Sequence, residues 1–166
     1  MKGFTSTAKP RRARRLFWFL AVAGACGYAP VRGRVGPSMQ VAAVKNDTAQ
    51  AEVGGIFATE LRSELAGRGR LSSEGTSGPE LLLEVLALNS LPTAVGSEGA
   101  AAYRLDGRFT VKVGDYTDTL GGSEDYLSGV DVLGTEANRR AALRRLARTV
   151  AREAVERYDV SEKFAK

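Results

Sequence analysis

Histidine is absent from this 166-residue sequence, and cysteine occurs only once, at position 26. Without histidine the chain lacks the commonest general base and metal ligand of proteins. A single cysteine cannot form a disulfide within the chain. With no histidine beside it, this cysteine cannot build a Cys/His zinc site or a Cys-His nucleophile pair, and a Ser-His-Asp triad is equally excluded.

The remaining candidates for catalysis are weak. Glu124 and Asp125 are adjacent, and neighbouring residues of a strand point to opposite faces, so the two carboxylates do not converge. Gly54-Gly55 and the glycines at 67 and 69 lack the spacing of a phosphate-binding loop. We therefore predict no catalytic residue, no metal site and no enzymatic activity. An enzyme that uses a carboxylate pair is the least favoured alternative.

No long hydrophobic run is present either. The main apolar run covers residues 16–25, and a helix of that length rises about 15 Å, half of what a membrane span needs. Six basic residues and no acidic residue precede Cys26. A basic start, a short apolar run and small residues are typical of a secretory signal peptide, which we place at 1–25. Arg14-Arg15 leaves general and twin-arginine export both open.

The position of Cys26 directly after this run predicts its role. The residues Ala23-Gly24-Ala25-Cys26 resemble a bacterial lipobox, in which the cysteine becomes the first mature residue and carries a diacylglycerol and an N-acyl chain such as palmitate. The alternative is a free thiol beside an ordinary cleavage site. Several acyl chains give effectively permanent membrane anchoring. We predict that Cys26 is lipidated and that the Gly/Pro/Arg-rich segment 26–37 is a tether.

The excess of basic over acidic residues lies in the predicted signal peptide at 1–25, which would be removed. The whole chain has a formal net charge of +5, and removing the six basic residues before Cys26 leaves −1. This balance gives no reason to expect nucleic-acid binding. About 140 residues remain, enough for one domain, predicted at 38–160 with a C-terminal tail at 161–166.

Hydrophobic periodicity predicts the first elements of this domain. Residues 39–46 form a short apolar run typical of a buried strand. Asn46, Asp47 and Thr48 offer capping side chains for a following helix. The apolar face of that helix contains Val53, Ile56, Phe57, Leu61 and Leu65, and Gly67 and Gly69 are expected to end it. After a loop at 72–79, a strand is predicted at 80–91, followed by a flexible connection.

The clearest pattern is a strict alternation between residues 103 and 113. Apolar or small residues alternate with polar ones, as in a strand with one buried and one exposed face. The inward set is Tyr103, Leu105, Gly107, Phe109, Val111 and Val113. A weaker, glycine-containing strand is predicted at 119–128. Thr135 is expected to cap a helix that ends near Tyr158, with an apolar stripe including Leu143, Leu146 and Val150.

Together these elements predict an α+β fold. The order β-α-β-β-β-α favours a two-layer sandwich, with a mostly antiparallel four-stranded sheet and two helices packed on one face. Arg104, Arg108 and Lys112 then lie on the uncovered face of the sheet. They either form ion pairs, with Asp106 as the expected partner, or bind phosphates or an acidic surface. Arg140, Arg144 and Arg148 on the second helix are either solvated or a second such surface.

Five stretches of the sequence resemble the LptE family of lipopolysaccharide-assembly lipoproteins. They are "CGY-P", "VAAVKNDT", "LLLEVLAL", "YRLDGRFTVKV" and the closing segment "EDYLSGVDVLGTEANRRAALRRLARTVAREAVERY". The resemblance covers nearly everything after Cys26.

The resemblance implies a function that is not enzymatic. The lipid on Cys26 would hold the protein at the periplasmic face of the Gram-negative outer membrane. There the domain would plug the LptD-type β-barrel, help that barrel fold and bind lipopolysaccharide. The alternative is a generic envelope lipoprotein that acts as a pilotin or scaffold for another secretion complex.

Overall fold

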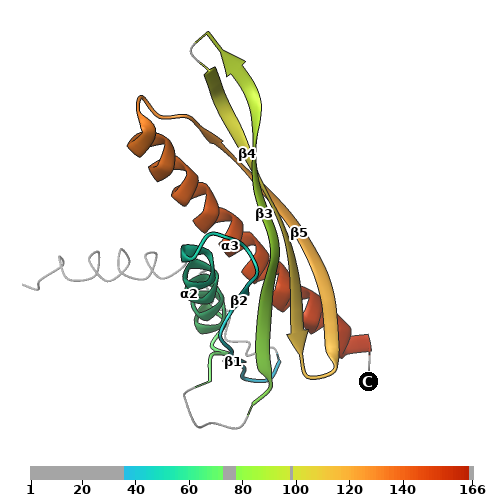
Figure 1. The fold of residues 1–166 in the computed structure, drawn as a ribbon. Coiled ribbons are helices and arrows are strands. Elements are labelled where there is room, and N and C mark those ends of the chain that lie inside the picture. The colour runs from blue at the N-terminus through green and yellow to red at the C-terminus, as the bar shows by residue number, and fades with distance from the viewer. Residues whose placement is uncertain (1–35, 73–77, 98, 165–166) are drawn as a thin grey trace, which may run out of the picture. The chain divides into compact units, whose positions relative to one another are not determined.

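The computed structural model describes residues 36–72, 78–97 and 99–164. The elements are β1 (Gln40–Val41), β2 (Lys45–Asn46), α2 (Glu52–Gly67), β3 (Glu80–Gly96), β4 (Gly99–Val113), β5 (Tyr116–Leu127) and α3 (Val132–Phe164). Both helices lie on one side of the sheet (Figure 1). The predicted signal peptide, Cys26 and most of the predicted tether lie outside the described residues. Within the described ranges, no helix is both long and apolar enough to cross a membrane.

The sheet has the predicted α+β character with one difference at its edge. β3, β4 and β5 form an antiparallel meander, and β1 and β2 each pair in parallel with β3. The single strand expected at 39–46 is thus two strands of two residues each, so the mostly antiparallel sheet is mixed and five-stranded. The parallel pairing follows from the connection, because the chain crosses from β1 to β3 through a helix.

The segment 92–100 is expected as a flexible connection, and its described residues 92–97 and 99–100 belong to the distal part of the β3–β4 hairpin. Pro92 lies within β3, opposite Tyr103 of β4. Proline has no N–H to donate, but β2 ends opposite Val85, so this stretch of β3 has an open edge where no ladder bond is lost. Irregular pairing on both sides of Ala94 accommodates the ring.

The alternation of residues 103–113 is confirmed. Leu105, Phe109 and Val111 are fully buried, whereas the alternate residues Asp106, Arg108 and Thr110 are on the opposite face. The ring of Phe109 packs on Phe57 of α2, with centroids 4.9 Å apart. It also covers Gly107, where a Cβ atom would lie 2.3 Å from the ring, so this position needs glycine.

Helix α2 ends as predicted but begins differently. Its N-cap residue is Ala51 and no side chain caps it, so the expected caps were wrong. The Asn46 side chain instead accepts from the Thr48 N–H and organises the turn before the helix. At the other end Gly69 has φ +65°, and the N–H groups of Gly69 and Arg70 donate to the Ala66 and Leu65 carbonyls. This is a Schellman motif, which requires the left-handed residue that glycine supplies.

Helix α3 is longer than predicted at both ends. The carboxylate of Asp131 accepts from the Gly134 N–H at 2.6 Å, so Asp131 caps the helix and Thr135 does not. The helix continues through Phe164, and residues 161–164 of the expected tail are therefore helical. Its buried stripe includes the predicted Leu143, Leu146 and Val150. The two helical stripes and the inner face of the sheet form one core.

Candidate functional site

The outer face of the sheet carries the first set of predicted ligand-binding residues. Arg104, Arg108 and Lys112 are all exposed and project from β4 away from the helices. Neither of the two described helices covers this side of the three long strands (Figure 1). The placement agrees with the alternation in the sequence.

Arg104 is engaged in a cross-strand ion pair. Its Nε and Nη2 donate to the two carboxylate oxygens of Asp125 at 2.8 and 3.1 Å. Asp125 lies directly opposite on β5, so Asp106 was the wrong partner. The hydrogen bonds from Arg104 hold the pKa of Asp125 below its usual value. An anionic ligand at Arg104 would have to compete with this carboxylate.

Arg108 and Lys112 are the uncommitted cations of this face. Neither makes a hydrogen bond or an ion pair with any other residue that the structure describes. The residues opposite Arg108 are Ala87 on β3 and Gly121 on β5, which leave its guanidinium open on both sides. The Cα atoms of Arg108 and Lys112 are four residue steps apart along β4, or roughly 13 Å.

Acidic side chains on the same face limit the positive potential. Asp106 lies between Arg104 and Arg108 along β4. Glu84 on β3 accepts a hydrogen bond from Lys45, which also pairs with Asp47 at 3.3 Å. The cationic character is therefore confined to the part of the face around Arg108 and Lys112.

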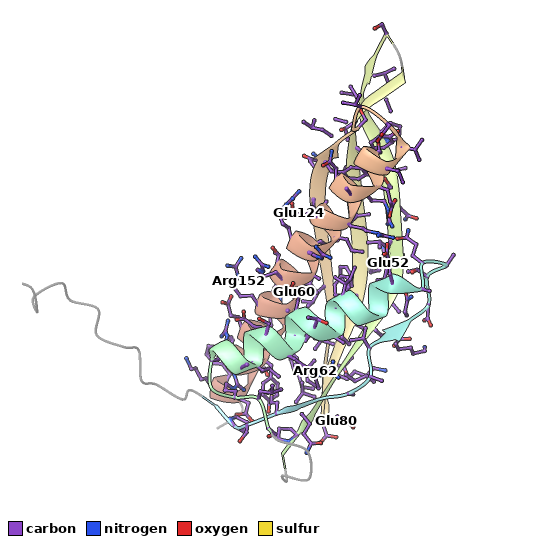
Figure 2. All side chains as sticks on the ribbon, turned by 90° about the vertical axis from the view of Figure 1, so that its left-hand side faces the viewer. Glu52, Glu60, Arg62, Glu80, Glu124 and Arg152 are labelled. Atoms are coloured by element: carbon purple, nitrogen blue, oxygen red, sulfur yellow. The ribbon has the colours of Figure 1, made fainter. Side chains whose placement is uncertain are left out.

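The predicted arginines of α3 also include both paired and unpaired side chains. Arg140 pairs with Glu52 of α2 at 3.1 Å, and Arg148 pairs with Glu60 at 3.3 Å. These two arginines therefore join the helices. Arg144 has no such partner among the described residues. Figure 2 looks onto this side, where α2 lies in front of α3 and the labelled Glu60 and Arg152 mark the two helices.

The carboxylate pair Glu124 and Asp125 is separated as predicted. Glu124 faces the helices and accepts from Arg145 at 3.0 Å, whereas Asp125 faces outward with Arg104. Across the described part of the chain, no group of three or more His, Cys, Asp or Glu residues is placed to hold a metal ion.

Sequence reasoning missed an exposed apolar surface at the far end of the domain. At this end the distal β3–β4 hairpin projects beyond the β5–α3 connection (Figure 1), and the Ser128 N–H donates to the Ala101 carbonyl at 3.1 Å where the two diverge. The exposed side chains are Leu91, Val95, Leu127, Val130, Val132 and Leu133, with Leu91 at 54% and Val130 fully exposed. The signal available in the sequence was the aliphatic residues Val95, Val130, Val132 and Leu133, which lie between the predicted strands and helices.

The fold is thus a two-layer α+β domain with one open sheet face. Residues 37–158 match the model of the LptE family, lipopolysaccharide assembly, and the chain belongs to this family. The resemblance seen in the sequence is confirmed. The match assigns the chain in general terms to the lipoproteins of lipopolysaccharide assembly in the Gram-negative envelope, which are not enzymes.

Solved structures show the same fold. Rare lipoprotein B from Shewanella oneidensis is 15% identical, with a TM-score of 0.53 over 76% of this chain and 98% of its own. A putative lipoprotein from Caulobacter crescentus CB15 is 14% identical, with a TM-score of 0.50 over 75% of this chain and 93% of its own. A comparison with curated proteins gives no match.

Proposed function

We propose that the protein binds lipopolysaccharide on the outer face of its sheet while docked to an LptD-type β-barrel. The acyl chains on Cys26 would hold it at the periplasmic face of the outer membrane. The observation that supports this proposal is the pair Arg108 and Lys112, two uncommitted cations on an uncovered sheet in a member of the lipopolysaccharide-assembly family.

The two cations suit a ligand that carries more than one phosphate. A guanidinium binds phosphate through two parallel hydrogen bonds, whereas an ammonium acts as a point charge. The small residues beside Arg108 leave room for a head group to approach both nitrogens of the fork. Arg104 would make a smaller contribution, because binding there must displace Asp125. Arg144 offers a second site for the same chemistry, and Arg140 and Arg148 would contribute less because they hold α2.

The barrel partner is supported by the apolar end of the domain. Exposed aliphatic side chains gathered at one end of a domain favour contact with another macromolecule. A plug inside a barrel would cover the hairpin, the β5–α3 connection and the sheet face at once. Nothing in this role needs a catalytic group.

Charge reversal tests the lipopolysaccharide site. In Arg108→Glu/Lys112→Glu, affinity for purified lipopolysaccharide should fall roughly tenfold or more at low salt, equivalent to ~1.4 kcal/mol. High salt should reduce the difference between wild type and variant. The matched control is Arg62→Glu/Lys163→Glu, which reverses two exposed cations away from this face. Circular dichroism checks folding. Equal affinity of the two double variants at low salt would contradict the proposed site.

Purification with the lipid anchor intact tests the partner. A large β-barrel that co-purifies in stoichiometric amount supports docking to the translocon. A secretin, or no partner at all, would instead favour the pilotin or scaffold function. Substituting Val95 and Leu133 with aspartate should reduce recovery of the barrel without unfolding the domain, because both side chains are exposed.

A further inference from the structure

Arg70 is a buried arginine at the point where the chain enters the domain. Its side chain is 1% exposed, and no other charged residue is buried among those that the structure describes. A buried arginine is retained only when its donors are satisfied and its charge is paired. Its contacts therefore indicate what it holds in place.

The end of α2 directs Arg70 into the domain. Gly69 adopts the left-handed conformation of the Schellman motif, and Arg70 is the next residue. That position commonly carries an apolar residue that packs back on the helix. Here the backbone turn sends a guanidinium toward the start of the described chain and the end of α3.

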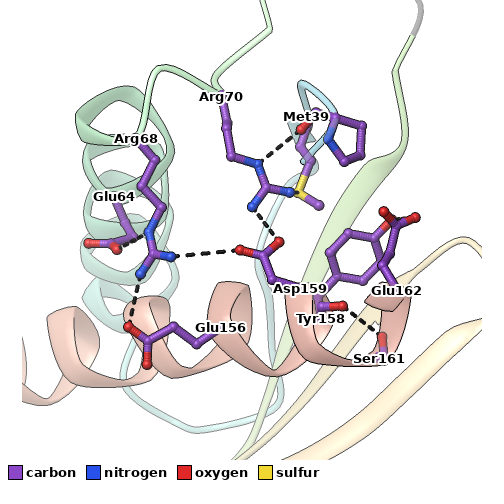
Figure 3. Close-up of polar contacts among 10 residues, drawn as sticks. Met39, Glu64, Arg68, Arg70, Glu156, Tyr158, Asp159, Ser161 and Glu162 are labelled. Atoms are coloured by element: carbon purple, nitrogen blue, oxygen red, sulfur yellow. Dashed lines mark hydrogen bonds and ion pairs between the residues drawn. The ribbon is translucent and has the colours of Figure 1, made fainter. Parts of the chain in front are cut away.

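The guanidinium joins two segments that are far apart in sequence. Its Nη1 donates to the Asp159 carboxylate of α3 at 2.5 Å, and its Nε donates to the Pro37 carbonyl at 3.0 Å. Nη2 lies 3.7 Å from the Met39 sulfur. Figure 3 shows Arg70 between Met39 and Asp159.

Gly36 lies directly against the Arg70 guanidinium. It has φ +95°, and a Cβ atom there would lie 2.8 Å from both Cζ and Nη2 of Arg70. Only glycine satisfies the conformation and the close approach together. Residues 36, 37 and 39 therefore surround one guanidinium.

Backbone bonds also hold this segment, because the Met39 N–H donates to the Arg70 carbonyl and the Met39 carbonyl accepts from the Ser72 N–H. The strand that follows is short. β1 pairs only Gln40 and Val41 with β3. If the chain before residue 36 is pulled, such a strand separates one residue at a time. With Arg70 in place, the pull passes through Pro37 and the guanidinium into Asp159 and the long helix α3.

We propose that Arg70 and Asp159 form a clasp that fixes where the N-terminal segment leaves the fold. The clasp keeps residues 36–41 folded when that segment is under tension. In a lipid-anchored protein it would fix the point at which the tether leaves the domain. This inference does not depend on which ligand or partner the domain binds.

Arg70→Met tests the clasp, with Arg68→Met as the matched control. Arg68 also lies near Asp159, at 3.8 Å, and pairs with Glu64 and Glu156, so its ion pairs are to the two helices and not to the segment 36–39. Hydrogen exchange of the Met39 to Ala42 amides should accelerate about tenfold or more in Arg70→Met, while the strands β4 and β5 keep their protection. The control should leave exchange at Met39 unchanged.

Pulling the unacylated protein between Cys26 and a cysteine introduced by Lys166→Cys measures the mechanical role directly. Wild type should unfold without an early step. Arg70→Met should first lengthen by at most roughly 20 Å, the extended length of residues 36–41. If Arg70→Met fails to fold, Gly36→Ala decides, because it displaces the guanidinium and keeps its charge. The proposal would be overturned if the variant that folds shows wild-type hydrogen exchange at Met39 to Ala42 and unfolds under tension without an early step.

Discussion

At the scale of single residues, Arg108 and Phe109 show how one strand separates ligand chemistry from packing. The two residues are adjacent, and the pleat sends them to opposite faces of the sheet. Phe109 is fully buried between α2 and Gly107, whereas Arg108 lies in solvent without a partner among the described residues. Stability and the proposed ligand binding on β4 should therefore be separable by mutation.

We expect Phe109→Ala to lower the free energy of unfolding by about 3–5 kcal/mol, because it removes a large buried side chain and leaves a cavity. Arg108→Ala should change it by less than about 0.5 kcal/mol. Urea denaturation of both variants measures the contrast. Similar losses in the two variants would show that the assignment of the two faces is wrong.

The alternation in the sequence was sufficient to predict these two orientations, but it could not predict which cations are paired. The partner of Arg104 is 21 residues away on β5, and the pairing depends on the register set by the β4–β5 turn at Gly114. Arg70 was missed for the same reason, since Asp159 is 89 residues away in sequence. Long-range pairing is a property of packing and not of local pattern.

At the scale of elements, α2 is joined to α3 by an ion-pair network around Arg139. Its guanidinium donates to Glu136 of its own helix and to Glu52 of α2 at 2.6 Å. The hydrogen bond from Arg139 is the main reason that the pKa of Glu136 lies below its usual value. A carboxyl group with a lowered folded-state pKa stabilises the fold above its unfolded pKa of about 4.3, and this contribution is lost as the pH falls.

Glu136→Gln should therefore destabilise the protein near neutral pH, by less than about 1 kcal/mol because the pair is partly exposed. The difference in free energy of unfolding between wild type and variant should disappear as the pH falls through about 4 toward 3. Urea midpoints across this range measure it. The same series at high salt should show a smaller difference, and a difference that persists unchanged to pH 3 would contradict the role of Glu136.

The open edge of β5 is covered by side chains instead of another strand. The Arg145 guanidinium donates to the Asp125 carbonyl, and the Asn138 amide donates to the Leu127 carbonyl, both at 3.0 Å. Further along, the Asp118 carboxylate accepts from the Thr119 N–H. Unpaired backbone groups on a sheet edge invite pairing with another chain, so these contacts protect the monomer from association.

We expect Asn138→Ala/Arg145→Ala to self-associate more than wild type. The double variant exposes two carbonyls of β5 and leaves the buried stripe of α3 intact. Sedimentation velocity over a range of concentrations measures the change, and Arg144→Ala/Arg152→Ala serves as a control on the same helix. Identical sedimentation of the double variant and wild type would show that the edge needs no such protection.

The two helices and the three long strands could be predicted from periodicity, but apart from the end of α2 most of their ends could not. The predicted caps at Asn46 and Thr135 failed because each side chain had an alternative backbone partner nearby. The prediction placed Pro92 at a strand end, since it could not know that this part of β3 has an open edge. The parallel pairing of β1 and β2 also had no local signal.

At the scale of the whole molecule, the described domain carries its functions at different places. The sheet face presents Arg108 and Lys112, the hairpin end presents aliphatic side chains, and the clasp holds the segment that leads back toward Cys26. If that cysteine is the only membrane attachment, localisation and folding should be independent properties. Cys26 lies outside the described residues.

Cys26→Ser should leave a folded protein that no longer fractionates with outer membranes. The substitution removes the site of acylation, and with it about 0.8 kcal/mol of membrane affinity for each buried CH₂. Membrane fractionation followed by immunoblotting measures the distribution, and circular dichroism of the purified variant confirms folding. A partner barrel would retain part of the variant, so the comparison belongs in cells depleted of that barrel. If the serine variant still pellets as fully as wild type under depletion, Cys26 is not the anchor.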